Sequence, residues 1–91
     1  MHIEIILFGI EDCPDCLKQK SILEEEFGDG GYKFVDIESD SVSDLMLISK
    51  FEIDSAPSIV IIKKEGEAER KFRHVGIISA SKMQQFIERI K

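Results

Sequence analysis

Basic residues, cysteines and long apolar runs are all scarce in this sequence, and each shortage excludes a class of protein. Lysine and arginine total 12 against 18 aspartates and glutamates, which gives a net charge of −6. An acidic chain argues against nucleic acid or an anionic membrane as the main partner, because both attract clustered cations. The longest apolar run is far too short to cross a membrane and lacks the basic flank of a signal peptide. We therefore expect a cytoplasmic protein that binds neither nucleic acid nor membrane.

The only two cysteines, Cys13 and Cys16, are separated by two residues. They cannot form the multi-bridge framework of a small secreted domain, and in a reducing compartment this CxxC spacing indicates a catalytic or a metal-binding pair. A zinc site needs about four ligands, and the two histidines, His2 and His74, lie at opposite ends of the chain. We therefore expect no metal and no other cofactor, and a redox-active pair of thiols instead.

Apolar runs and helical periods predict four strands and three helices in one domain over residues 1–91. Strands are expected over residues 3–8, 32–37, 58–62 and 68–75, with a hairpin turn over 63–67. The last strand is rich in charge, as is typical of a sheet edge. The first helix is expected over residues 14–27. The second is expected to begin after one of several N-cap candidates in residues 39–43, and the third to run from Ser79 or Ser81 to Ile90.

The order β-α-β-α-β-β-α predicts an α/β fold. A helix between the first two strands favours a right-handed parallel crossover, and the hairpin makes the last two strands antiparallel. The result is a mixed sheet with helices on both faces. The expected core positions are Cys16, Lys20, Leu23 and Phe27 in the first helix, Leu45, Met46, Ile48 and Phe51 in the second, Phe72 in the last strand, and Met83, Phe86, Ile87 and Ile90 in the third helix.

The two cysteines lie where the first strand is followed by the first helix. Free N–H groups and the positive end of the helix dipole favour a thiolate at this point, so Cys13 is the expected nucleophile. Cβ atoms three positions apart on a helix are roughly 5–6 Å apart, so Cys16 can reach disulfide distance and is the expected resolving thiol. Pro14 suits a first turn, because no helical hydrogen bond is lost there. An inert buried pair is the alternative.

Three segments resemble the thioredoxin superfamily, and the likeness covers essentially the whole chain. They are residues 13–16 (CPDC), residues 50–59 (KFEIDSAPSI), which end just after a candidate cis-proline, and residues 75–79 (VGIIS). The resemblance implies a three-layer α/β/α fold with strand order 2-1-3-4. It also implies a monomeric thiol-disulfide oxidoreductase that reduces protein disulfides and is itself reduced by a reductant of the thioredoxin-reductase type.

The resemblance also implies site residues around the dithiol. Pro14 and Asp15 would support it, and Ala56, Pro57, Val75 and Gly76 would bind substrate. A cis bond before Pro57 would turn the backbone of Ala56 toward the dithiol, where an extended substrate segment can pair with it. The alternative is that Pro57 simply begins a strand.

Two departures from the family pattern concern glutathione and proton transfer. Glutathione-binding glutaredoxins carry a basic residue shortly before the first cysteine, whereas this chain has Glu11 and Asp12. Together with Asp15 these acids repel the carboxylates of glutathione, each by about 1 kcal/mol or less after screening. We therefore do not expect glutathione to be a partner. Leu7 stands where thioredoxins have a buried acid, so proton transfer to Cys16 has to use water or another group.

The three acids also have two interpretations. They are either solvated loop charges, with Asp12 as an N-cap, or they oppose thiolate formation and select basic protein partners. Two other functions stay open as well: a glutathione-dependent glutaredoxin, and a thioredoxin-fold binding or adaptor module without turnover.

Overall fold

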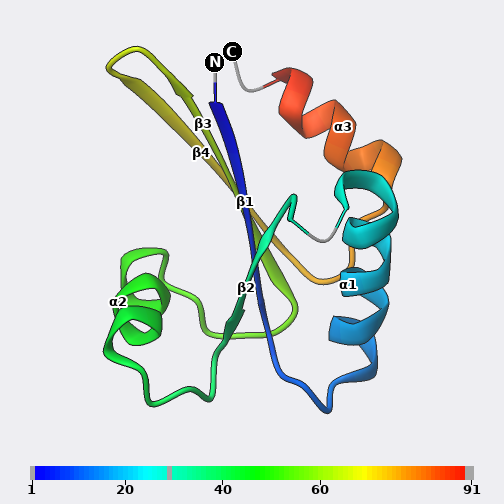
Figure 1. Ribbon diagram of the computed structural model, residues 1–91, viewed down its shortest axis with the longest axis vertical. Helices are drawn as coiled ribbons and strands as arrows, with labels where there is room; N and C mark the ends of the chain where they lie inside the picture. Colours follow the sequence, from blue (N-terminus) through cyan, green and yellow to red (C-terminus); the bar gives the residue numbers. More distant parts are fainter. Residues whose placement is uncertain (1, 29, 90–91) are drawn as a thin grey trace.

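The computed structural model describes residues 2–28 and 30–89, and its element order is the expected one (Figure 1). The elements are β1 (His2–Gly9), α1 (Pro14–Phe27), β2 (Lys33–Asp36), α2 (Val42–Lys50), β3 (Ser58–Glu65), β4 (Ala68–Val75) and α3 (Ala80–Arg89). The predicted bounds of α1 and β4 are confirmed. Ile90, the expected end of the last helix, lies outside the described residues.

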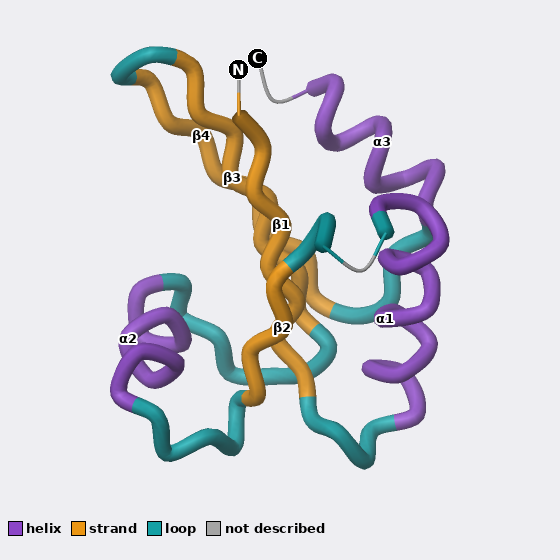
Figure 2. The backbone as a smooth tube through the Cα atoms, viewed as in Figure 1, coloured by secondary structure: helices purple, strands orange, loops and turns teal. Residues whose placement is uncertain are grey.

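The four strands form one mixed sheet in the order β2-β1-β3-β4, which confirms the predicted topology. β1 runs parallel to β2 and antiparallel to β3, and β3 runs antiparallel to β4. Figure 2 shows α2 on one face of the sheet and α1 with α3 on the other. The charge-rich strand β4 is an edge strand, as its composition predicts.

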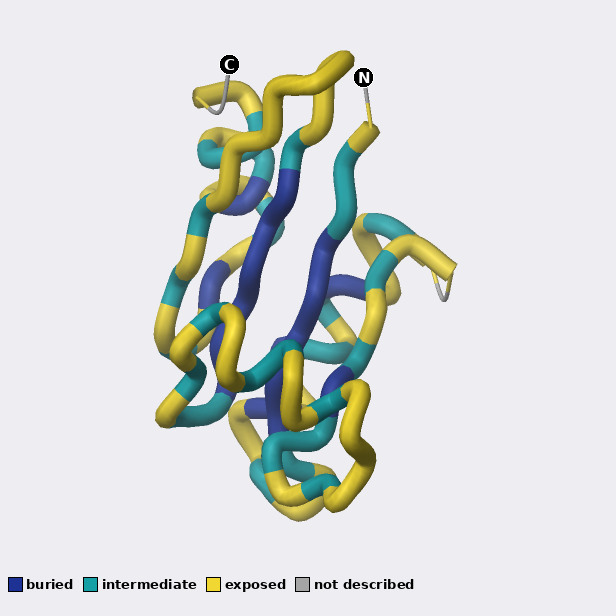
Figure 3. Tube along the Cα trace, turned by 90° about the vertical axis from the view of Figure 1, so that its left-hand side faces the viewer, coloured by how far each residue is buried: buried dark blue, intermediate teal, exposed yellow. Residues whose placement is uncertain are grey.

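The core consists of two apolar layers, one on each face of the sheet. In β1, Ile5 and Leu7 belong to the layer shared with α1 and α3, whereas Ile6 and Phe8 belong to the layer shared with α2. This alternation follows from the two-residue period of a strand. β1 and β3 are therefore buried on both faces, and Figure 3 shows the buried positions concentrated in the middle of the molecule.

The predicted hairpin between the last two strands is confirmed, but its turn is shorter than residues 63–67, because the β3–β4 ladder continues to its last pair, Glu65 with Ala68. Lys63 and Lys64 are ladder residues, and the loop is reduced to two residues. Its first residue, Gly66, has a φ of 61°, which a two-residue hairpin loop requires and glycine adopts at low cost. The end of β3 was not predicted as strand, because Lys63 and Lys64 are charged and this part of the strand lies near solvent.

The predicted core face of α2 is also partly wrong. Leu45 and Met46 are 48% and 68% exposed, and Leu47 packs against the core in their place with Ile48 and Phe51. Residues 45–48 are four consecutive apolar residues, so periodicity cannot decide which side of such a short helix is buried. Ser41 is the N-cap residue, within the expected range, but its side chain makes no capping hydrogen bond.

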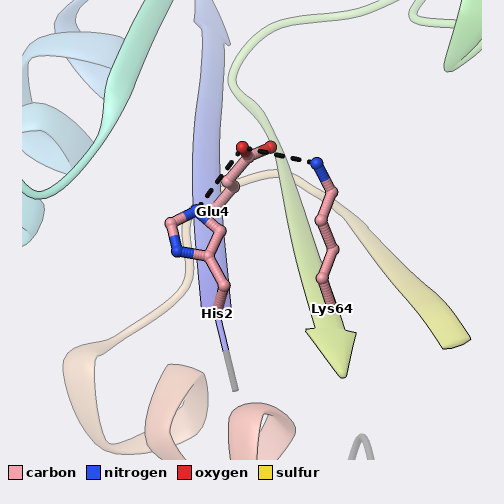
Figure 4. Close-up of polar contacts among 3 residues, drawn as sticks. All are labelled: His2, Glu4 and Lys64. Carbon is pink, nitrogen blue, oxygen red and sulfur yellow. Dashed lines mark ion pairs between the residues drawn. The ribbon is translucent and has the colours of Figure 1, made fainter. Parts of the chain in front are cut away.

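Glu4, the one acidic residue in the apolar run of β1, lies between His2 and Lys64 at the opposite end of the strand from the cysteines (Figure 4). Its Oε1 atom lies 3.5 Å from Nε2 of His2 and 3.6 Å from Nζ of Lys64 on the neighbouring strand. All three side chains are substantially exposed, so these pairs contribute at most about 1 kcal/mol each.

Candidate dithiol active site

Strand register brings the predicted site segments to one edge of the sheet. Phe8 at the end of β1 pairs with Ser58 at the start of β3, and Ser58 pairs with Val75 at the end of β4. The loop to the cysteines and the segments around Pro57 and Gly76 therefore leave the sheet at the same edge (Figure 1). The N–H of Gly76 donates to the carbonyl of Pro57 at 2.8 Å.

The Ala56–Pro57 peptide bond is cis, which confirms the conformation that the resemblance implies. Pro57 itself is buried, Ala56 is half-buried, and Val75 is 55% exposed. A role for these residues in substrate binding stays a prediction.

Cys13 is the N-cap residue of α1, with φ −89° and ψ 116°. Its Sγ accepts a hydrogen bond from the backbone N–H of Cys16 at 3.3 Å, so the sulfur occupies the place usually taken by a capping oxygen. A donated N–H at a helix start is an interaction that stabilises a negative sulfur. Pro14 is the first helical residue, as predicted. The alternative in which Asp12 caps the helix is therefore wrong.

Cys16 lies behind Cys13 in the same turn and is only 2% exposed. Burial is the main reason why the pKa of the Cys16 thiol is raised above its ordinary value of 9.0, and the hydrogen bond and charge of Cys13 and the charge of Asp15 act in the same direction. The N–H of Ile10, which donates to Sγ of Cys16 at 3.5 Å, acts in the opposite direction. Both thiols are free in this structure. The arrangement places a half-exposed cysteine in front of a buried one.

Gly9 allows α1 to approach the end of β1 this closely. A Cβ atom at Gly9 would lie 3.2 Å from both Cβ and Sγ of Cys16 and 3.1 Å from Cε2 of Phe34. These distances are shorter than ordinary van der Waals contact, so Phe34 or Cys16 would have to shift by a few tenths of an ångström to admit a side chain here.

Gln19 is a site residue that the sequence did not reveal. It is completely buried, its Oε1 accepts from the N–H of Ile78 at 2.7 Å, and its Nε2 donates to the carbonyl of Ile78 at 3.0 Å. Lys20, predicted to face the core, is only half-buried, and its Nζ lies 4.8 Å from the centroid of the Phe34 ring. The burial of Gln19 could have been predicted from the helical spacing of Cys16, Gln19 and Leu23, which places this uncharged residue on the buried face of the helix.

The surface around the dithiol is both acidic and apolar. Glu11, Asp12 and Asp15 are all exposed, next to a half-exposed Cys13. Leu17 and Ile77 are 54% and 37% exposed. Within residues 2–28 and 30–89, no group of three or more His, Cys, Asp or Glu side chains is placed to hold a metal ion. None of the described helices is both long enough and apolar enough to span a membrane.

The sheet order, the CxxC pair at the start of α1 and the cis-proline at the same sheet edge define a thioredoxin-like α/β protein with a dithiol site. Comparison with solved structures agrees. Trichomonas vaginalis thioredoxin matches with a TM-score of 0.70 and 22% identity, over 98% of this chain and 79% of that one. Chloroplastic thioredoxin z matches with a TM-score of 0.62 and 26% identity, over 96% and 76% of the two chains.

The C-terminal domain of Neisseria meningitidis DsbD in its oxidised form matches with a TM-score of 0.69 and 12% identity, over 98% of this chain and 80% of that one. No protein-family model and no curated protein sequence matches the chain. The chain therefore has a thioredoxin-like fold, which it shares with these solved structures.

Proposed function

We propose that this protein is a thiol-disulfide oxidoreductase that reduces disulfides in other proteins. The observation that carries the proposal is the unequal placement of the two thiols. Cys13 is half-exposed and its Sγ accepts the N–H of Cys16, whereas Cys16 is buried three residues further along the helix. A structural pair of cysteines would need neither the exposure of the first nor its position at a helix start.

In the first step, the Cys13 thiolate attacks one sulfur of the substrate disulfide. A bond forms between Cys13 and that sulfur, the substrate S–S bond breaks, and the other substrate sulfur leaves as a thiolate that takes up a proton. The segments around Pro57 and Gly76 lie at the same sheet edge as Cys13. We assign to Ala56, Pro57, Val75 and Gly76 the binding of an extended substrate segment by strand-like hydrogen bonds and apolar contact.

In the second step, Cys16 loses its proton and attacks Sγ of Cys13. The mixed disulfide breaks, the second substrate thiol is released, and Cys13 and Cys16 form an internal disulfide. The substrate gains two electrons, and an external reductant has to return them. We propose a reductant of the thioredoxin-reductase type, because the acids Glu11, Asp12 and Asp15 oppose the docking of glutathione. We also propose that the protein acts as a monomer in the cytoplasm.

Insulin reduction in the presence of a dithiol reductant tests this proposal. The wild-type protein should accelerate the reduction, and Cys13→Ser should abolish the acceleration. Cys16→Ser should instead accumulate mixed disulfides with target proteins, because the first step survives and the second does not. Activity that persists in Cys13→Ser would contradict the assignment of the nucleophile.

A thioredoxin-fold binding module with an incidental dithiol is the competing function, and reduction kinetics separate the two. Rapid reduction of the Cys13–Cys16 disulfide by a thioredoxin reductase, coupled to insulin reduction, supports the enzyme. A wild-type protein that binds partners, but whose disulfide is reduced neither by the dithiol reductant nor by thioredoxin reductase, favours the binding module.

A further inference from the structure

The second step requires a proton acceptor for Cys16, and the described part of the core holds no such group. The buried polar side chains there are Gln19 and Ser58, and neither titrates near neutral pH. Leu7, in the strand that leads to the dithiol, is completely buried and apolar. A proton that leaves the Cys16 thiol therefore has to move toward the surface.

A small pocket beside Cys16 supplies a route. It has a volume of about 180 Å³ and is lined by Ile10, Glu11, Cys16, Leu17, Lys20 and Phe34. Since a water molecule takes up about 30 Å³ of liquid, the pocket has room for several waters. Apart from Cys16 itself, the titratable side chains in its wall are Glu11 and Lys20. Cys13 at the N-cap of α1 and Asp15 in its first turn also act on Cys16, but neither lines the pocket.

We propose that Glu11 accepts the proton of Cys16 through water in this pocket during the second step, and that Lys20 stabilises the resulting thiolate. This inference rests on the proposed function. The proton passes from Sγ of Cys16 to the Glu11 carboxylate, and the thiolate electron pair then forms the bond to Sγ of Cys13 while the bond from Cys13 to the substrate sulfur breaks. Glu11 later returns its proton to solvent.

The two side chains have different roles because their charges differ at neutral pH. A carboxylate accepts a proton, whereas an ammonium group has none of the lone pairs needed. The Lys20 ammonium instead supplies positive charge, and its contact with the Phe34 ring holds it at the wall of the pocket. Glu11 is thus the catalytic residue of the pair, and Lys20 acts by its charge.

The sign of one substitution separates proton transfer from simple electrostatics. If Glu11 acted only as a nearby negative charge, it would oppose the Cys16 thiolate, and Glu11→Gln would accelerate the second step. If Glu11 accepts the proton, Glu11→Gln slows the same step. A merely structural role for Glu11 would change stability without changing how the rate depends on pH.

The experiment follows the second step alone. Cys13 is first converted at low pH to its mixed disulfide with thionitrobenzoate, with the modified site confirmed by mass spectrometry. A jump to neutral pH then lets Cys16 attack, and the release of coloured thiol gives the rate. The variants are Glu11→Gln, Glu11→Asp and Lys20→Met. Asp12→Asn and Lys18→Met are matched controls, because both residues are exposed neighbours that do not line the pocket.

We expect Glu11→Gln to slow the release by about a hundredfold, the lower end of general-base effects. Its rate should rise with pH more steeply than that of the wild type, because hydroxide replaces the lost acceptor. Glu11→Asp should retain part of the rate, Lys20→Met should slow the release severalfold, and the two controls should not slow it. An unchanged or faster release in Glu11→Gln overturns this inference alone. A wild-type adduct that releases no thiol overturns the proposed function as well.

Discussion

Gln19 in α1 and Ile78 after β4 are joined by a pair of hydrogen bonds across 59 positions of sequence. The glutamine amide accepts from the N–H of Ile78 and donates to its carbonyl, so one side chain replaces the pairing that a neighbouring strand would supply. The contact fixes the segment that follows Val75 and Gly76 to the helix that carries Cys16. Gln19 therefore holds two parts of the candidate site in a constant relative position.

Gln19→Met should destabilise the protein by about 1–3 kcal/mol, because the shape is nearly kept while the N–H and carbonyl of Ile78 lose their partner in a buried place. Urea unfolding of the reduced protein measures the change. Gln84→Met is the matched control, since Gln84 donates to Glu26 in an exposed hydrogen bond. Its effect should stay within about 0.5 kcal/mol. Equal losses in both variants would contradict the role given to Gln19.

Gly9→Ala should destabilise the protein by about 1–3 kcal/mol through overpacking, because the new Cβ would lie 3.1–3.2 Å from Phe34 and Cys16. The displaced Cys16 should also react faster with a small alkylating agent. Gly30→Ala is the control: a Cβ there meets no atom within 4 Å. A Gly9→Ala variant as stable as Gly30→Ala would show that the contact at Gly9 is not tight.

The topology could be predicted from the sequence because its strongest signals are periodic. Ile5 to Phe8 form an unbroken apolar run, which indicates a strand buried on both faces, and Met83, Phe86 and Ile87 follow a helical period. Both patterns result from burial against a sheet, so they lead to the same layered fold. The phase of α2 could not be predicted, because apolar residues occur on more than one side of it.

The site was predictable only as far as its chemistry is local. Cys13, Pro14 and Cys16 are close in sequence, and their positions at the start of a helix follow from that spacing. Gln19 and the constraint on Gly9 depend on contacts with Ile78 and Phe34, which are distant in sequence. No local pattern specifies those partners, so both features appear only when the chain is folded.

The acidic surface beside Cys13 makes a prediction about glutathione. Asp12→Lys should raise the rate at which glutathione reduces the Cys13–Cys16 disulfide severalfold at low ionic strength, because repulsion of the glutathione carboxylates becomes attraction. Glu69→Lys is the control with the same change of charge, since Glu69 is exposed on β4 next to Lys64, far from the dithiol edge. Added salt should remove most of the gain. A wild-type protein that glutathione already reduces rapidly would restore the glutaredoxin alternative.

The raised pKa of Cys16 predicts how stability changes with pH. In the unfolded chain the thiol loses its proton near its ordinary pKa of 9.0, whereas in the folded protein burial holds the proton to higher pH. Above 9.0 the unfolded state therefore binds fewer protons than the folded state, and the free energy of unfolding falls as pH rises. Well below this value both states are protonated, and the thiol contributes no pH dependence.

Urea unfolding of the fully reduced protein at neutral pH and at several values above 9.0 measures this effect as a difference between variants. Cys16→Ser should lose less stability over the alkaline range than the wild type, because serine does not titrate there. Cys13→Ser should retain most of the wild-type dependence of stability on pH. Burial is the largest cause of the raised pKa of Cys16, and the interactions with Cys13 are smaller causes. Lysines titrate in every variant, so their contribution cancels in the comparison. Parallel curves for wild type and Cys16→Ser would mean that the folded protein does not protect the proton on Cys16.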